Sequence, residues 1–203
     1  VTGSYKLREL ESDIVLRHLS RESKAKLGAP GVHNVRNALA AAAAATALEI
    51  PLNVIAAGLE RFSGIKGRLQ RKRARQGAVL IDDTYNANPE SVRAAISVLA
   101  QAPGRKVLVF GDMGELGHDA PRLHAEVGVV AKEARIDRLL AFGENSVEAT
   151  KAFGGNAKHF TRIEDLLEDL QSALAPDVTV LVKGSRFMKM ERVVNALELN
   201  SGQ

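Results

Sequence analysis

The 203-residue sequence contains no cysteine, which excludes a disulfide scaffold and a thiolate metal site. Such a chain suits a reducing compartment, and we expect it in the cytoplasm. Aromatic residues make up only 4% of the chain, against 45% for hydrophobic residues as a whole. The core must therefore be built from small and branched aliphatic side chains packed against alanine-rich helices.

Long apolar runs are also missing. No stretch approaches the roughly 20 apolar residues that a membrane span needs, because the run Ala40–Ala45 is too short and alanine is too weakly apolar. The first residues, Val1–Lys6, lack the apolar core of a secretory leader. We therefore expect no insertion into a membrane.

The charged residues and histidines indicate neither a metal site nor a nucleic-acid partner. The net charge of +4 fits an enzyme that handles phosphate-bearing substrates, although many proteins without anionic partners have the same balance. The five histidines are scattered, and no pair has metal-ligand spacing with a supporting acid. The run Arg71-Lys72-Arg73, followed by Arg75, lacks the interleaved aromatics of a single-strand binder. An exposed strand face explains this run better.

The first part of the chain gives a mixed pattern. Residues 1–30 are polar and weakly patterned, and we expect strands or loops there. Composition predicts helices over Asn34–Leu48 and Pro51–Phe62. Residues 69–75 and 78–81 are typical of a strand pair. We assign residues 1–85 to a partial, helix-rich domain.

From residue 86 onward, strands and helices alternate regularly. Asn88 and Pro89 are a good N-cap and first residue for a helix, and Thr161 with Glu164 predicts a capping box. The predicted strands are Lys106–Phe110, Arg138–Phe142 and Val178–Val182, and the predicted helices are Pro121–Ala134, Ser146–Ala152, Thr161–Leu174 and Met188–Leu197. This alternation favours a Rossmann-like, mostly parallel α/β domain over residues 86–203.

Two groups of polar residues lie before residue 90. Asn34 and Asn37 are three apart and would share one helix face, where two amides suit the edge of a planar base; an N-cap plus one exposed asparagine is the alternative. Asp82 and Asp83 end a predicted strand, where α/β proteins bind ligands. Tyr85 beside them offers a ring for stacking. A turn plus an N-cap explains Asn88-Pro89 but not the paired acids.

Two loops follow strands in the second half. The glycines at 111, 114 and 117 have the spacing G-x-x-G-x-x-G, which differs from the G-x-G-x-x-G of a dinucleotide loop, so a dinucleotide cofactor is poorly supported. Lys183-Gly184-Ser185-Arg186 follows a strand and is expected to open a helix, where backbone N–H groups attract anions. A basic loop with a helix start is the alternative.

These segments together resemble the second half of the Mur ligase family. The resemblance rests on His33-Asn34-x-x-Asn37, Gly67-Arg68, the string from Asp82 to Pro89 and the two later loops, and it covers roughly residues 31–197 in the right order. The string Asp82–Pro89 is most similar to the branch that adds D-alanyl-D-alanine to UDP-N-acetylmuramoyl-tripeptide. The resemblance therefore implies a piece of the central ATP-binding domain, followed by the C-terminal domain.

The resemblance also implies residue roles and ligands. ATP and Mg²⁺ are the expected cofactors, with the two asparagines beside the adenine, Arg68 near phosphate and Asp83 at the ribose. A monomer is expected for the full-length enzyme. The expected nucleotide-site residues are His33, Asn34, Asn37, Arg68, Asp83, Tyr85 and Asn86. The expected substrate-site residues are Asn88, Asp112, Lys183, Ser185 and Arg186; no catalytic residue or metal ligand is assigned.

The chain departs from the family in one respect. Ligases of this type cradle the β- and γ-phosphates with a G-x-x-x-x-G-K-[ST] loop, and no Gly-Lys dipeptide occurs in this sequence. We therefore expect the chain to be a fragment that is inactive alone.

Other functions remain open at this point. A sister ligase that adds another amino acid is the main alternative among enzymes. A non-catalytic binding module derived from a ligase would also explain the missing loop, although the paired acids argue against decay. An oxidoreductase is a more distant alternative, because the glycine spacing is wrong.

Overall fold

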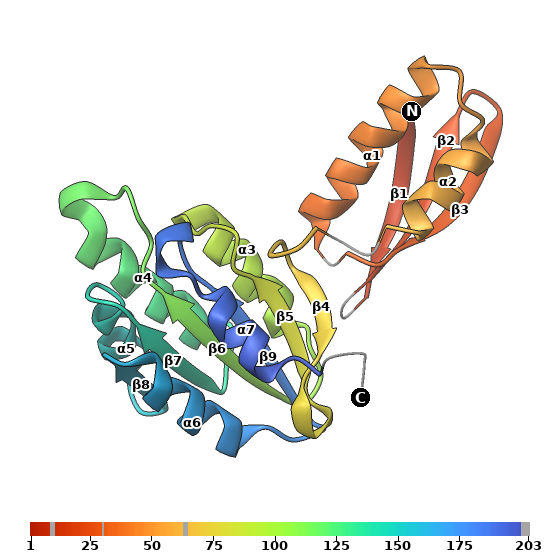
Figure 1. The fold of residues 1–203 in the computed structure, drawn as a ribbon. Coiled ribbons are helices and arrows are strands. Elements are labelled where there is room, and N and C mark those ends of the chain that lie inside the picture. Colours follow the sequence, from red (N-terminus) through yellow and green to blue (C-terminus); the bar gives the residue numbers. More distant parts are fainter. Residues whose placement is uncertain (9–10, 30, 63–64, 200–203) are drawn as a thin grey trace. The chain divides into compact units, whose positions relative to one another are not determined.

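The computed structural model describes residues 1–8, 11–29, 31–62 and 65–199. The chain divides into two compact units, Val1–Ile65 and Lys66–Gln203, and each is described by itself (Figure 1). Among the described residues, no helix combines the length and apolarity that crossing a membrane requires.

The first unit is a small sheet covered by two helices. Strands β1 (Thr2–Leu7), β2 (Ser12–His18) and β3 (Arg21–Leu27) form an antiparallel meander in that order. Alternation along β2 buries Ile14 and Leu16 on one face, where they pack with residues of both helices. These helices are α1 (Val32–Ala47) and α2 (Leu52–Glu60). The weakly patterned residues 1–30 thus supply three strands.

The second unit is built on a six-stranded sheet with the order β4-β5-β9-β6-β7-β8. Only β4 runs antiparallel; its neighbour β5 and the other strands are parallel. All six residues of β9 are buried, as expected for a strand in the middle of a sheet covered on both faces. The strand bounds are β4 Gln70–Arg73, β5 Val79–Asp83, β6 Arg105–Gly111, β7 Arg138–Phe142, β8 Ala157–Phe160 and β9 Val178–Lys183.

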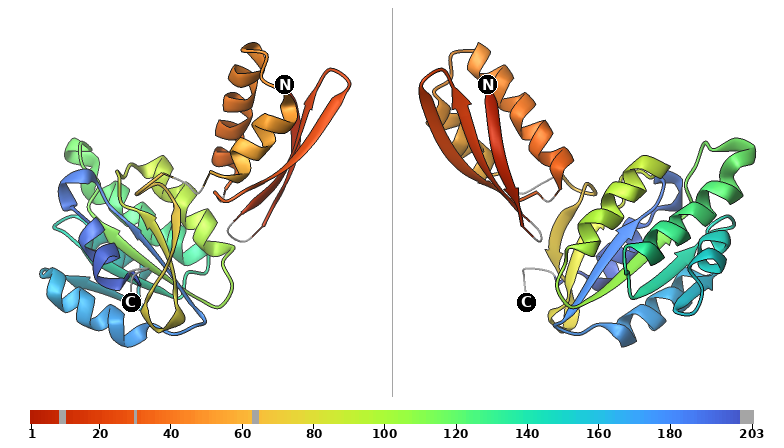
Figure 2. Two further views of the ribbon diagram at one scale, coloured as in Figure 1. Left: turned by 45° about the vertical axis from the view of Figure 1, so that its right-hand side comes forward. Right: turned by 180° about the vertical axis from the view of Figure 1, so that it is seen from behind.

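Helices cover both faces of this sheet. Figures 1 and 2 show α6 and α7 over one face and α3, α4 and α5 over the other. The α6–α7 face buries Leu80, Val107 and Val180 against Leu166 and Leu197. The helix bounds are α3 Pro89–Ala100, α4 Ala120–Glu133, α5 Val147–Phe153, α6 Ile163–Ala173 and α7 Glu191–Leu197, and short 3₁₀ turns cover Arg75–Gly77, Gly117–Asp119 and Arg186–Met188.

The mostly parallel α/β class expected from the sequence is confirmed. The expected boundary at 85/86 differs from the division into compact units, which falls between Ile65 and Lys66. The reason is sheet pairing: β5 lies beside β9, with Leu80 opposite Val180, so the β4–β5 hairpin belongs to the second sheet.

Three local expectations also need correction. β8 was not expected, because its sequence Ala157-Lys-His-Phe160 carries no apolar run. The capping box at Thr161 is absent, since the N-cap of α6 is Arg162 without a side-chain cap bond. The last helix begins at Glu191 rather than Met188, because Lys189 adopts a left-handed conformation with φ 51°.

Candidate functional site

The candidate site in the second unit lies at the carboxyl ends of the parallel strands. Loops follow β5 at residues 84–88, β6 at 112–116, β7 at 143–146 and β9 at 184–185. Because parallel strands end at the same edge of a sheet, these loops are neighbours, and α/β proteins bind ligands there.

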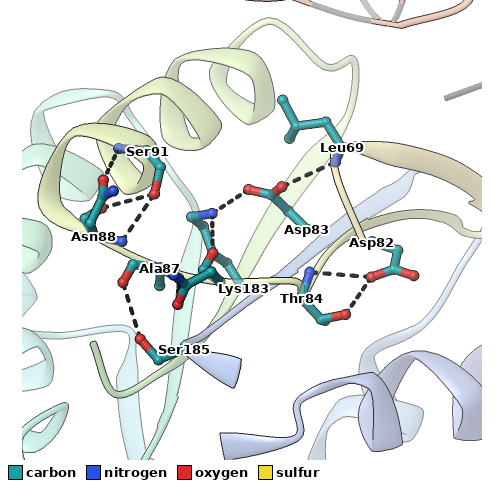
Figure 3. Close-up of polar contacts among 10 residues, drawn as sticks. Leu69, Asp82, Asp83, Thr84, Ala87, Asn88, Ser91, Lys183 and Ser185 are labelled. Carbon is teal, nitrogen blue, oxygen red and sulfur yellow. Dashed lines mark hydrogen bonds and ion pairs between the residues drawn. The ribbon is translucent and has the colours of Figure 1, made fainter. Parts of the chain in front are cut away.

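A buried ion pair joins the ends of β5 and β9. Asp83 and Lys183 are register partners, and Lys183 Nζ lies 2.6 Å from Asp83 Oδ2 (Figure 3). Lys183 also donates to the Asn86 carbonyl at 2.9 Å, and Asp83 Oδ1 accepts from the Leu69 N–H at 3.1 Å. Burial raises the pKa of Asp83, while Lys183 and the Leu69 N–H act against the rise. Lys183 therefore holds the loop after β5, and Asp83 ties the end of β5 to the residue before β4.

Asp82 points to the other face of the sheet and serves a separate network. Its Oδ1 accepts from the Thr84 hydroxyl at 2.7 Å and from the Thr84 N–H at 3.2 Å (Figure 3). Its Oδ2 lies 3.6 Å from Lys72 Nζ, and that amine pairs with Glu198 at 2.8 Å. The two acids at the end of β5 thus have different partners on opposite faces.

Ser185 connects three of the loops. Its hydroxyl donates to the Ala87 carbonyl at 3.0 Å and accepts from the Gly114 N–H at 2.7 Å. Its own N–H donates to the Asp112 carbonyl at 2.9 Å. Ser185 is only 3% exposed, so its polar atoms are directed into the protein.

Asp112 is likewise turned inward and is 4% exposed. Its Oδ1 accepts from the Ser146 N–H at 2.7 Å and its Oδ2 from the Asn145 N–H at 3.0 Å. Gly143 has φ 130°, and a Cβ there would collide with the Asp112 carboxylate. The carboxylate therefore ties the loop after β6 to the loop after β7.

His124 supports the same loop from helix α4. It is fully buried; its Nε2 accepts from the Met113 N–H at 2.9 Å and its Nδ1 lies 2.6 Å from the Ala120 carbonyl. A ring nitrogen that accepts from an amide cannot carry a proton, so the other nitrogen, Nδ1, donates to Ala120. His124 was not singled out from the sequence, since a lone histidine within a helix gives no signal.

Arg68 and Tyr85 form an exposed stacked pair. The Arg68 guanidinium lies 4.3 Å from the centroid of the Tyr85 ring, and Tyr85 is 50% exposed. The Tyr85 N–H donates to the Gly67 carbonyl at 3.0 Å. Gly67 has φ 73°, and a Cβ there would lie 3.0 Å from the Tyr85 nitrogen, so glycine is needed for this close approach. The structure thus brings together Arg68, Tyr85 and the neighbouring Asp83.

The remaining predicted residues of this unit differ in availability. Asn86 is exposed, and its Oδ1 accepts from the Ala87 N–H at 2.9 Å. Asn88 is the N-cap of α3, as expected, and its Oδ1 accepts from the Ser91 N–H at 2.8 Å. The Arg186 side chain is 68% exposed and meets only Glu191, at 3.4 Å, among the described residues. Of the expected substrate residues, Arg186 therefore has the most accessible charge.

Phe187 is a site residue that the sequence reasoning missed. It is 61% exposed, and its ring lies 3.0 Å from the position of a Cβ at Gly114. An aromatic residue in a chain with so few of them, directly after Arg186, was the available signal.

His33, Asn34 and Asn37 lie in the first unit, in the first two turns of α1. The two asparagines share one helix face, as their spacing predicts. Gly31 occupies the N-cap, so the alternative that Asn34 caps the helix is wrong. In the part of the chain that the structure describes, no group of three or more His, Asp or Glu side chains could hold a metal ion.

Comparison with known proteins identifies relatives. The family model described as "Mur ligase, glutamate ligase domain" matches residues 67–186. The UDP-N-acetylmuramoyl-tripeptide--D-alanyl-D-alanine ligase of Escherichia coli (strain K12) is 44% identical over 173 residues, which cover 84% of this chain and 38% of that protein. This chain thus spans well under half of that relative.

Solved structures give the same result. A crystal structure of MurF from Acinetobacter baumannii matches with a TM-score of 0.85 and 36% identity, covering 94% of this chain and 43% of that one. MurF ligase from Thermotoga maritima in complex with ADP matches with a TM-score of 0.81 over 95% of this chain and 44% of that one. Its identity of 23% shows a common fold alone.

Proposed function

This chain belongs to the Mur ligase family, and from that premise we propose that it is the C-terminal part of an ATP-dependent ligase that joins D-alanyl-D-alanine to UDP-N-acetylmuramoyl-tripeptide in peptidoglycan synthesis. The observation that carries the proposal is the 44% identity to a ligase of that name over 84% of the chain. Because the match covers only 38% of that ligase, we propose that this chain is not competent alone. The absence of cysteine supports a cytoplasmic location.

The proposed reaction has two steps. The tripeptide carboxylate attacks the γ-phosphorus of ATP, forming an acyl phosphate and releasing ADP. The dipeptide amine then attacks the acyl carbon, loses a proton and expels inorganic phosphate. Among the described residues, no group of three or more His, Asp or Glu side chains could hold a metal ion, so no residue is proposed as a Mg²⁺ ligand.

For the nucleotide, we assign Arg68, Asp83, Tyr85 and Asn86 in the second unit. The exposed Tyr85 ring can stack on a base or sugar, and the Arg68 guanidinium beside it can pair with phosphate oxygens. Each Asp83 carboxylate oxygen has two acceptor directions and receives one hydrogen bond, from the Leu69 N–H or from Lys183, so each oxygen can accept another from a ligand. For His33, Asn34 and Asn37, in the first unit, the proposed role in nucleotide binding rests on the resemblance to the family alone.

For the dipeptide, we propose that Arg186 contacts the carboxylate directly. The proposed roles of Lys183, Ser185, Asp112 and Asn88 in substrate binding are then indirect, since the polar groups of these residues already hold the loops together. This arrangement leaves one accessible guanidinium beside a fixed loop, which suits a small anionic peptide.

Isothermal calorimetry on this chain tests the dipeptide assignment. We expect D-alanyl-D-alanine to bind, and Arg186→Gln to weaken binding by roughly tenfold through loss of a charge-assisted hydrogen bond. Arg105→Gln is the matched control, because Arg105 is an exposed arginine at the start of β6, whereas the candidate site lies at the carboxyl ends of the strands. Equal weakening by both variants contradicts the role of Arg186. Tight binding of free amino acids but not the dipeptide favours a sister ligase.

The nucleotide assignment is tested with ADP. Tyr85→Ala is expected to weaken ADP binding by roughly tenfold through loss of ring stacking, whereas Tyr85→Phe keeps the ring and should bind as the unchanged chain does. Turnover by this chain alone would overturn the proposal that it is incomplete.

A further inference from the structure

Positive charge is concentrated along β4 and the residues on either side of it. Six of the ten residues from Lys66 to Arg75 are lysine or arginine, and none is acidic. Two of these cations have partners: Arg68 stacks on Tyr85, and Lys72 pairs with Glu198 and Asp82. Of the other four, Lys66 lies before β4, and Arg71, Arg73 and Arg75 are called the arginine strip below.

The arginine strip is exposed and unneutralised. All three residues are exposed, and none forms an ion pair with any acid in the described segments of the chain. Arg71 and Arg73 alternate with Lys72 along β4, so their side chains share one face with Cα atoms about 7 Å apart. Their partners on β5 are Ile81 and Val79, which supply no charge. Like charges so placed repel each other.

A hollow adjoins the strip. Its volume is ≈ 610 Å³, within the range of small-molecule sites, and it is lined by Arg71, Lys72, Arg73, Ala74, Gly77, Ala78, Val79 and Leu199. Because β4 runs antiparallel to β5, Arg73 lies beside Val79 at the start of β5, and Asp83 lies at its other end. The hollow is therefore separate from the carboxyl-end loops.

Protection of a sheet edge does not account for the strip. Edge strands often carry charge that prevents pairing with another chain. Here the outer edge of β4 is already covered at Arg73 and Ala74: the Leu199 N–H donates to the Arg73 carbonyl at 2.9 Å, and Glu198 bridges Ala74. Edge protection also gives no reason for a hollow beside the guanidiniums.

We propose that the hollow beside β4 binds a phosphate-bearing ligand, held by Arg71 and Arg73 with Arg75 at the periphery. A guanidinium presents a planar fork of donors that matches phosphate oxygens. A phosphate group offers three acceptor oxygens and can engage two guanidiniums at once, whereas a single carboxylate is matched by one fork. The small and apolar residues Gly77, Ala78 and Leu199 leave room for the rest of the ligand.

The test is a titration of the ¹⁵N-labelled chain with inorganic pyrophosphate, followed by nuclear magnetic resonance at constant ionic strength. We expect the amide signals of residues 71–79 to shift. In Arg71→Gln/Arg73→Gln, binding at this position should weaken by roughly tenfold for each guanidinium removed. Arg71→Lys/Arg73→Lys keeps the charge without the fork and should bind with intermediate affinity.

Arg93→Gln/Arg122→Gln is the matched control, because it removes two charges from exposed pairs with Glu126. Its titration should match that of the unchanged chain, and melting curves should show that every variant is folded. Vesicles of phosphatidylcholine with and without phosphatidic acid separate a lipid headgroup from a soluble phosphate compound; binding of either through the strip supports the proposal. The proposal is overturned if the signals of residues 71–79 do not shift, or if the control variant weakens binding equally. It is also overturned if a parallel titration shows binding of polyglutamate, a carboxylate polymer, but not of pyrophosphate.

Discussion

At the scale of single residues, the loops at the carboxyl ends of the strands are held together by Asp83, Lys183, Ser185 and Asp112. The structure turns their polar atoms toward neighbouring loops, at distances of 2.6–3.1 Å. The local sequence indicates that a residue ends a strand. Which groups its side chain contacts depends on the distant strand with which that strand pairs.

The Asp83–Lys183 pair gives a stability prediction. Lys183→Met leaves the buried Asp83 carboxylate without its counterion, and we expect a loss of about 3–5 kcal/mol in the free energy of unfolding at neutral pH. In an Asp83→Asn background the same change should cost much less. Urea unfolding of the unchanged chain, the two single variants and the double variant measures this coupling. Equal losses of unfolding free energy from Lys183→Met in both backgrounds would contradict it.

The same pair gives a pH dependence. Burial raises the pKa of Asp83 above its ordinary value of 3.8, so the folded chain binds this proton more tightly than the unfolded chain does. That contribution to stability is fully present below pH 3.8 and is lost as the pH rises through the folded-state pKa. Asp83→Asn lacks this titration. As the pH rises from below 3.8, the free energy of unfolding of the unchanged chain should therefore fall relative to that of Asp83→Asn, as measured by urea unfolding. A relative rise for the unchanged chain would contradict this prediction.

At the scale of elements, apolar runs and N-caps predicted most of the second unit. β6, β7 and β9 follow Lys106–Phe110, Arg138–Phe142 and Val178–Val182 closely, and Asn88 caps α3. β8 escaped prediction because it is a polar edge strand whose place depends on pairing with β7. Periodicity does not report such pairing.

Two glycines in helices predict opposite effects of one substitution. In Gly128→Ala on α4, the new Cβ would collide with the Ala149 carbonyl of α5, and we expect a loss of about 1–3 kcal/mol from overpacking. In Gly58→Ala on α2, nothing lies within 4 Å of the new Cβ. The second change should stabilise its unit by about 0.5–1 kcal/mol through helix propensity. Thermal unfolding measures both; stabilisation by Gly128→Ala would show that α4 and α5 do not pack as described.

At the scale of the whole molecule, the location of the boundary was the main thing that sequence could not give. The regular alternation of strands and helices from residue 86 onward suggested a division at 85/86, whereas the compact units divide at 65/66. The contacts that place β5 in the second unit, such as Leu80 with Val180, join residues 100 positions apart, so no local sequence pattern indicates them.

Truncation tests this division. Residues 66–203 contain the complete six-stranded sheet and both helical layers, so this piece should unfold cooperatively by circular dichroism when expressed alone. A piece beginning at residue 86 lacks β4 and β5, which exposes the apolar edge of β9, and should aggregate or remain unfolded. Cooperative folding of the shorter piece would restore the boundary at 85/86.

The position of β9 between β5 and β6 also affects how the protein is made. β9 follows β5 by about 100 residues, so the ribosome synthesises β5 long before the strand that separates it from β6. At roughly 5–20 residues per second, that delay lasts about 5–20 seconds. Once β6 has also been synthesised, two apolar strands lack the partner that lies between them in the sheet until β9 is made.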